Sequence, residues 1–200
     1  MKESNLRTPT QKRAIEKKEK ILENGFKLMC KQGYHNTDAI QIAKAAGVST
    51  GTVYQYYKDK KDIFYQGLKE YAKDLMFPII NIEIKEFSRN NIKSEIKELI
   101  KYVINRHTIS NIAHKEITAM ECTDSEIFEL FEGYELEATE KLINLIKANN
   151  VKTENLYEKA HLIHSWIDNL CHEVVYHKHD NMDYEKMIDL VAQSIIDLLK

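Results

Sequence analysis

Residues that interrupt helices are scarce in this sequence. Only 2 prolines and 6 glycines occur among 200 residues. Proline lacks a backbone donor and glycine weakens a helix, so this scarcity leaves long segments able to be helical. Apolar residues recur at the period of about 3.6 that is typical of amphipathic helices, without the alternation that is typical of strands. The sequence therefore predicts an all-α protein.

Cysteines and long apolar runs are also few. The 3 cysteines, Cys30, Cys122 and Cys171, are far apart and odd in number, which argues against a disulfide framework and fits a reducing compartment. No run approaches the roughly 18 apolar residues of a membrane span. The segment from Met1 to Lys20 is too charged for a signal peptide. We expect a cytoplasmic protein without a membrane partner.

The net charge of −2 conceals two oppositely charged parts. Residues 1–73 hold 15 lysines and arginines against 8 acidic residues, and residues 74–200 hold 14 against 23. A basic segment attracts a polyanion, whereas an acidic segment is repelled by one. This asymmetry predicts two domains with different partners.

The apolar periodicity predicts about nine helices. A glycine or polar break bounds most of them, Pro78 is expected to bend or end the fourth, and Thr123 to Glu126 has the form of a capping box. The expected ranges are about 10–31, 38–46, 50–56, 58–77, 88–107, 110–121, 124–147, 154–178 and 184–199.

Residues 37–57 have the composition of a helix-turn-helix. Small residues allow two helices to cross closely, Gly47 can adopt a positive φ in the turn, and Ser49 can cap the next helix. Val53 is expected in the core, together with one of Tyr54 and Tyr57. The expected buried face of the second helix comprises Ile40, Ile42, Ala43 and Ala46.

Four segments match the order and spacing of a known DNA-binding domain. They are Gly33 to Thr37, Ile42 to Ser49, Gly51 to Tyr54 and Tyr56 to Lys60. Over about residues 12–73 the chain resembles the TetR (tetracycline-repressor) family, although Tyr57 stands where that family usually has phenylalanine. The resemblance implies a helix-turn-helix DNA-binding domain over 11–73 and a helical bundle over 74–200 for effector binding and dimerisation.

The function that this resemblance implies is that of a bacterial transcriptional regulator. We expect a repressor, not an enzyme, that binds a pseudo-palindromic DNA operator as a homodimer. A small-molecule effector would release it, and no cofactor is expected.

The candidate DNA-binding residues divide by chemistry. Thr50, Thr52 and Gln55 are candidates for base contacts, and Gly51 lets the helix N-terminus come close to DNA. Hydroxyls, an ammonium and helix-start amides suit the phosphate backbone. The candidates for that role are Thr37, Ser49, Tyr54, Tyr56 and Lys60.

The C-terminal part offers two candidate surfaces. Aromatic and sulfur-containing side chains are candidates for an effector pocket, although such residues also form cores. They are Phe77, Tyr102, Met120, Phe128, Phe131, Tyr134 and Trp166. The last helix has an apolar stripe that either pairs across a two-fold axis or packs within one subunit. This stripe comprises Met187, Ile188, Val191, Ile195, Leu198 and Leu199.

A metal site is the main chemical alternative. His161, His164, Asp168 and His172 share a narrow sector of one predicted helix, and imidazole and carboxylate groups bind transition metals. An ordinary polar face explains the same spacing, so we expect no metal. No phosphate loop or nucleophile motif indicates an enzyme.

Overall fold

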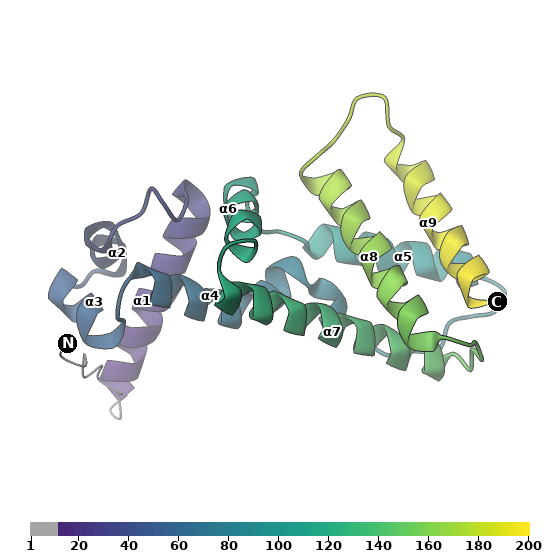
Figure 1. Ribbon diagram of the computed structural model, residues 1–200, viewed down its shortest axis with the longest axis horizontal. Coiled ribbons are helices and arrows are strands. Elements are labelled where there is room, and N and C mark those ends of the chain that lie inside the picture. Colours follow the sequence, from purple (N-terminus) through teal and green to yellow (C-terminus); the bar gives the residue numbers. More distant parts are fainter. Residues whose placement is uncertain (1–11) are drawn as a thin grey trace. The chain divides into compact units, whose positions relative to one another are not determined.

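The computed structural model describes residues 12–200, which form nine α-helices, one 3-10 helix and no strand (Figure 1). None of the helices in this range is long and apolar enough to cross a membrane. The helices are α1 (Lys12–Gln32), α2 (Ala39–Ala46), α3 (Thr50–Tyr56), α4 (Lys60–Met76), η1 (Pro78–Asn81), α5 (Ile92–Arg106), α6 (Asn111–Glu121), α7 (Ser125–Ala148), α8 (Leu156–Val175) and α9 (Tyr184–Leu199).

The all-α prediction and the order of the helices are confirmed. α3 has the predicted bounds, and α4 ends at Met76, just before the proline that was expected to bend or end it. Pro78 instead occupies the first turn of η1, where its missing N–H costs no hydrogen bond. The predicted start of the first helix, near Thr10, lies outside the described residues.

The chain forms two compact units. Within the described residues, the N-terminal unit comprises residues 12–72 and 109–128, and the C-terminal unit comprises residues 73–108 and 129–200. Residues 109–128, which contain α6, therefore pack with the N-terminal helices, whereas the sequence suggested a single boundary near residue 73. Contacts between α6 and α1 explain the difference, because the Ser110 hydroxyl donates to the Cys30 carbonyl oxygen.

The core of the N-terminal unit is built where α1, α2 and α4 approach closely. The Phe26 ring lies 5.8 Å from that of Phe64. A Cβ built on Gly67 would lie 2.3 Å from the Phe26 ring, so only glycine lets α4 come this near to α1. These buried side chains each contribute about 1.5 to 3 kcal/mol of hydrophobic stabilisation.

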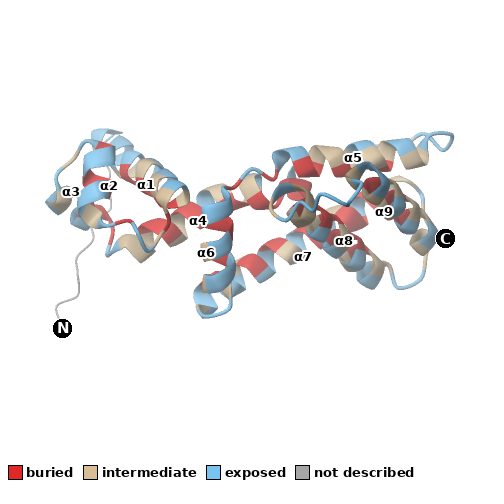
Figure 2. Ribbon diagram, turned by 90° about the horizontal axis from the view of Figure 1, so that it is seen from above, coloured by how far each residue is buried: buried red, intermediate tan, exposed pale blue. Residues whose placement is uncertain are grey.

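The C-terminal unit packs α5 and α8 against each other and α9 against both. Ile100, Ile167 and Ile195 are among its buried side chains, and the opposite faces of these helices are exposed (Figure 2). Lys93 and Lys97 of α5 both contact Asp189 of α9, at 2.7 and 3.0 Å. Their ammonium groups hold the pKa of Asp189 below its ordinary value.

Two local expectations are wrong. The Thr123 hydroxyl does not cap α7, because it donates backwards to the Ala119 carbonyl oxygen, and Asp124 accepts from the Glu126 amide instead. Ile40 is 69% exposed rather than part of the buried face of α2. The other three residues predicted for that face are buried, because α2 turns them and not Ile40 toward its neighbours.

Candidate nucleic-acid interface

A side-chain cap fixes the start of α2, and a backbone cap fixes its end. The Asp38 carboxylate accepts from the Gln41 amide at 2.8 Å, and the Gln41 side chain accepts from the Asp38 amide at 3.0 Å. This reciprocal pair is a capping box, which satisfies two amides that the helix leaves unpaired. Gly47 ends α2 with φ of 66°, so the predicted positive φ in the turn is confirmed.

Ser49 starts α3 immediately after this turn. Its hydroxyl oxygen accepts from the Thr52 amide at 3.2 Å, as the sequence predicted. The Ser49 and Thr52 hydroxyls are also 2.8 Å apart and share a hydrogen bond. Val53, 2% exposed, anchors the inner face of the short helix. Caps and one apolar anchor thus set the direction of α3.

The outer face of α3 remains accessible. Tyr54 is 52% exposed, Gly51 and Gln55 are exposed, and Thr50 and Thr52 are half-buried. The glutamine amide has both a donor and an acceptor, which is the pattern that pairs with an adenine edge. These residues therefore keep the surface that the predicted base contacts require.

Gly51 has no structural reason to be glycine. A Cβ built there would meet only the Ser49 Oγ, at 3.9 Å, and its φ lies outside the left-handed range. Alanine would fit this position and favour the helix. The absence of a side chain at this position leaves the N-terminus of α3 open to something that approaches it from outside the protein.

Two residues expected to contact phosphate are inside the protein. Thr37 is 2% exposed, and its hydroxyl donates to the Gly33 carbonyl oxygen at 2.7 Å. Tyr56 is 4% exposed, on the inner side of α3. Both side chains stabilise the unit, and neither offers much surface to a phosphate group.

Lys60 joins elements of the helix-turn-helix. Its ammonium donates to the Tyr34 carbonyl oxygen at 2.8 Å and to the Thr37 carbonyl oxygen at 2.9 Å, and it lies 4.4 Å from the centre of the Tyr34 ring. A lysine has three N–H donors. At most one of them remains for a phosphate, so the main contact of Lys60 is with the turn between α1 and α2.

The Tyr57 hydroxyl has the partner that its burial requires. Tyr57 is fully buried and donates to the Lys18 carbonyl oxygen at 3.0 Å. Burial, followed by the charge of Asp62, raises the pKa of this tyrosine far above its ordinary value. Of the pair Tyr54 and Tyr57, one was expected inside, and this expectation is confirmed.

Glu116 of α6 is a positioning residue that the sequence did not single out for this role. Its carboxylate accepts from the Tyr34 amide, and a Cβ on Gly33 would lie 2.8 Å from the same carboxylate. Gly33 also has a φ of 100°, a backbone conformation that glycine adopts much more readily than other residues. Because 82 residues separate Tyr34 and Glu116, no local pattern could have predicted this contact.

Two exposed lysines were also missed as candidates. Lys44 lies in the last turn of α2, and Lys58 follows the end of α3. Lys61, in contrast, is paired with Asp124 at 2.5 Å, and this hydrogen bond lowers the pKa of the aspartate. Exposure and position, rather than a motif, distinguish Lys44 and Lys58.

The structure does not gather the seven predicted effector-pocket residues around one cavity. The rings of Phe77, Phe131 and Tyr134 pack against one another, with centres 5.5 to 6.1 Å apart. Met120 and the half-exposed Phe128 belong to the N-terminal unit. Tyr102 and Trp166 are half-buried and lie outside this ring cluster. Mutual packing therefore uses the aromatic surface that a ligand would need.

The apolar stripe predicted to form the dimer interface largely faces its own unit. Ile188 and Ile195 are 5% and 4% exposed, because α9 packs on α5 and α8. The other four residues of that stripe are half-buried. The large apolar residue that α9 exposes is Leu190, at 65%, and it was not predicted.

The histidines of α8 are divided among different neighbours. His161 Nδ1 is 3.0 Å from the Thr139 hydroxyl, whereas the buried His164 stacks on Phe77 and His172 lies 3.8 Å from Asp168. Among residues 12–200, no three histidine, cysteine or acidic side chains are arranged to hold a metal ion. The four residues that helical spacing places on one face of α8 therefore differ in burial and in neighbours, since His164 is buried and the other three are half-buried.

The fold and this site define a class, an all-helical protein with an N-terminal helix-turn-helix and a C-terminal helical unit. Residues 21–66 match the family described as bacterial regulatory proteins, tetR family. The helix-turn-helix part of the chain is thus similar to this family.

Relatives and solved structures are similar in different parts of the chain. HbdR of Aromatoleum sp. (strain CIB) is 46% identical over 54 residues, which are 27% of this chain and 24% of HbdR. The fatty acid metabolism regulator protein of Bacillus subtilis is 34% identical over 87 residues, which are 44% of this chain and 41% of that protein. The matches thus span less than half of either relative.

Two solved structures are similar over nearly the whole fold. A chain from Mesorhizobium loti, titled as a TetR-family transcriptional regulator, has a TM-score of 0.72 at 15% identity and covers 94% of this chain and 98% of its own. A transcriptional regulator from Saccharomonospora viridis in complex with choline has a TM-score of 0.67 at 19% identity, covering 92% of this chain and 96% of its own. At these identities the likeness concerns the fold alone.

Proposed function

We propose that this chain is a transcriptional regulator that binds operator DNA through α3. The single observation that carries the proposal is Gly51, an exposed helical glycine that neither the packing nor the backbone of the protein requires. A DNA surface close to the N-terminus of α3 supplies the missing reason, because a side chain there would hold the helix away from the groove.

The residues around Gly51 then have distinct roles. Thr50 and Gln55 read base edges in the major groove, and Ser49, Thr52 and Tyr54 offer hydroxyls at the edges of this contact. The exposed ammonium groups of Lys44 and Lys58 neutralise phosphates. Thr37, Tyr56 and Lys60 support these contacts from inside by holding α2 and α3 in place.

The protein acts as a homodimer on a pseudo-palindromic operator. Two copies of α3 would then read two half-sites, one on each side of a two-fold axis. The outward faces of α8 and α9 suit the dimer contact, since Leu162 is 45% exposed and Leu190 is 65% exposed. The exposed Ser165 and Asn169 lie on the same face of α8 as Leu162, and the exposed Ser194 lies on the same face of α9 as Leu190.

In this proposal the bound dimer represses transcription in the cytoplasm, and a small molecule in the C-terminal unit releases it from DNA. The effector must bind the DNA-free protein more tightly than the DNA-bound protein. The ratio of these two effector affinities equals the factor by which the effector weakens DNA binding. No enzymatic step and no cofactor is part of this function.

Substitution of Gly51 tests the proposal directly. A duplex bound by the wild-type protein is first selected from random DNA, and the affinities of wild type and Gly51→Ala are compared by fluorescence anisotropy. We expect at least a 10-fold weaker complex, although alanine should stabilise the helix by roughly 0.5 to 1 kcal/mol. Gly133→Ala, at another glycine with open space around it, is the matched control and should bind normally.

Two results would contradict the proposal. Equal affinity of Gly51→Ala and wild type would show that DNA does not approach α3 closely. Failure of the folded wild-type dimer to select any duplex sequence would remove the regulator function itself.

A further inference from the structure

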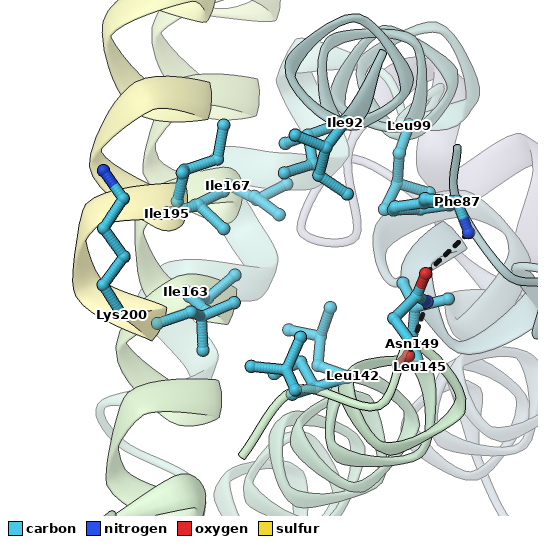
Figure 3. A pocket seen from close by; sticks show the side chains of 15 residues that line it. Phe87, Ile92, Leu99, Leu142, Leu145, Asn149, Ile163, Ile167, Ile195 and Lys200 are labelled. Atoms are coloured by element: carbon cyan, nitrogen blue, oxygen red, sulfur yellow. Dashed lines mark hydrogen bonds between the residues drawn. The ribbon is translucent and has the colours of Figure 1, made fainter. Parts of the chain in front are cut away.

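The C-terminal unit contains an apolar cavity that none of the seven predicted effector-pocket residues lines, although Ile195 and Leu199 of the predicted dimer stripe do. Its volume is about 230 Å³, and α5, α7, α8 and α9 all contribute side chains. Figure 3 shows Ile163, Ile167 and Ile195 on one side of this space and Leu142 and Leu145 on another. These five residues are at most 5% exposed, so the inner wall of the cavity is part of the core, whereas half-buried residues such as Phe87, Ile92 and Leu199 form its more open side.

Protein interiors rarely leave this much space unfilled. Cores are packed as densely as organic crystals and contain few voids larger than a water molecule, which occupies about 30 Å³. Apolar cavities of about 150 Å³ stay dry and bind small hydrocarbons. The size and lining of this cavity therefore favour an apolar occupant over water.

The polar group within the wall is already satisfied. The Asn149 amide nitrogen donates to the carbonyl oxygens of Lys85 and Leu145, at 3.0 and 2.8 Å, and its oxygen accepts from the Phe87 amide at 2.6 Å. Both of its N–H donors are thus used. Nothing in the wall calls for a polar ligand, since a buried polar group without a partner is costly.

Charges occur only at the edge of the cavity. Lys200 is the one charged lining residue, and its ammonium also contacts Asp197 at 2.6 Å. A second, more polar hollow shares Phe87, Ile92, Asn149 and Val151 with the apolar cavity and adds Glu86 and Arg89. Arg89 makes no ion pair within residues 12–200. The two linings together contain two cations, Arg89 and Lys200, and one acidic residue, Glu86.

We propose that this cavity binds the hydrocarbon chain of an anionic amphiphile, with its carboxylate or similar head group at Arg89 in the adjoining hollow. Dispersion contacts and the removal of apolar surface from water favour the chain, and the planar arginine donors suit a carboxylate. A small quaternary ammonium ion fits poorly, because no acidic or aromatic cage faces the interior of the cavity. The ligand class is thus opposite in charge to the choline bound by one structural neighbour.

The further role of this ligand as effector rests on the proposed DNA-binding function. Four helices line the cavity, α9 among them, so a bound chain contacts each of these helices. A ligand in the cavity therefore stabilises the arrangement of these four helices that fits it best. An effector acts in this way, by binding one conformation of the protein more tightly than another.

Calorimetry with decyl compounds tests the binding. We expect the full-length wild-type protein to bind decanoate saturably, with one site per chain and at least 10-fold tighter than decyltrimethylammonium, and not to bind choline. The Arg89→Gln variant should bind decanoate no better than decanol. Absence of saturable decanoate binding, or tighter binding of the cationic compound, would overturn the proposal.

Two variants locate the site. Leu99→Trp fills the cavity from α5 and should weaken decanoate binding at least 10-fold, whereas Ser94→Trp, at an exposed position of the same helix, should leave it unchanged. Wild-type protein labelled with a diazirine derivative of decanoate provides a second measurement if Leu99→Trp does not fold. Labels should lie on residues that line the cavity, either on the four cavity helices or at Phe87, Asn149 and Val151, and labels elsewhere would overturn the assignment.

Three further outcomes separate this inference from its alternatives. If Leu99→Trp converts the dimer to a monomer, the cavity belongs to a subunit contact and the ligand proposal is wrong. If decanoate binds but does not change affinity for the selected duplex, the ligand site stands and its effector role falls. If decanoate binds and no duplex is selected, the DNA-binding function fails while the ligand site stands.

Discussion

Single atoms determine how closely the N-terminal helices can approach. Gly67 lets α4 lie against Phe26, and Gly25 brings α1 within 3.0 Å of Ile63, measured from a Cβ built on the glycine. Lys60 adds a polar link by donating to two carbonyl oxygens of the turn before α2. At this scale, the position of the recognition helix depends on small side chains and one ammonium group.

The first stability prediction concerns this close packing. Gly67→Ala places a methyl group 2.3 Å from the Phe26 ring, so we expect a loss of roughly 1 to 3 kcal/mol in the free energy of unfolding. Overpacking should exceed the gain in helix propensity, which is about 1 kcal/mol. Urea unfolding measures the change, and Gly133→Ala in open space should be neutral or stabilising. A stable Gly67→Ala protein would mean that α1 and α4 are less tightly packed than described.

At the scale of elements, α8 shows that residues on one face of a helix can differ in burial. His164 is 5% exposed and stacks on Phe77, while His161 contacts a threonine hydroxyl. Burial lowers the pKa of His164 below its ordinary value, Asp168 opposes this effect, and His161 adds to it. The neutral imidazole is therefore the form that the folded helix favours.

This pKa shift predicts acid sensitivity. The unfolded chain binds a proton at His164 near pH 6.5, whereas the folded protein binds it only at lower pH. The stabilisation is thus fully present above pH 6.5 and is lost as the pH falls through the lowered pKa, with a slope of at most about 1.4 kcal/mol per pH unit. Urea unfolding between pH 7.5 and 5 should show a weaker pH dependence for His164→Asn than for wild type. An unchanged dependence would assign the acid sensitivity to other groups.

At the scale of the whole molecule, the proposed function requires two copies of the chain. Leu162→Glu or Leu190→Glu places a charge on the exposed face of α8 or α9 and should convert the dimer largely to monomer. Light scattering after size-exclusion chromatography measures the mass, and anisotropy should show weaker DNA binding in parallel. Leu136→Glu, on an exposed position of α7, is the matched control. Dimers that persist in both variants would place the interface elsewhere.

The sequence by itself determined the helices and the turn of the helix-turn-helix. These features depend on groups a few residues apart, such as the Ser49 hydroxyl and the Thr52 amide, or on one backbone angle, as at Gly47. Apolar periodicity also predicted most of the core, including Val53. Capping hydrogen bonds and helical periodicity depend only on residues that are near one another in the sequence, so these predictions could be made without a structure.

Only the tertiary structure decided which way side chains face and what they contact. It exposed Ile40, buried Thr37 and Tyr56, turned Lys60 toward the α1–α2 turn and joined Glu116 to Tyr34. It also packed the predicted pocket aromatics together and left an apolar cavity among aliphatic residues instead. Each outcome depends on packing between segments distant in the chain, and helical spacing defines a face without specifying its neighbour.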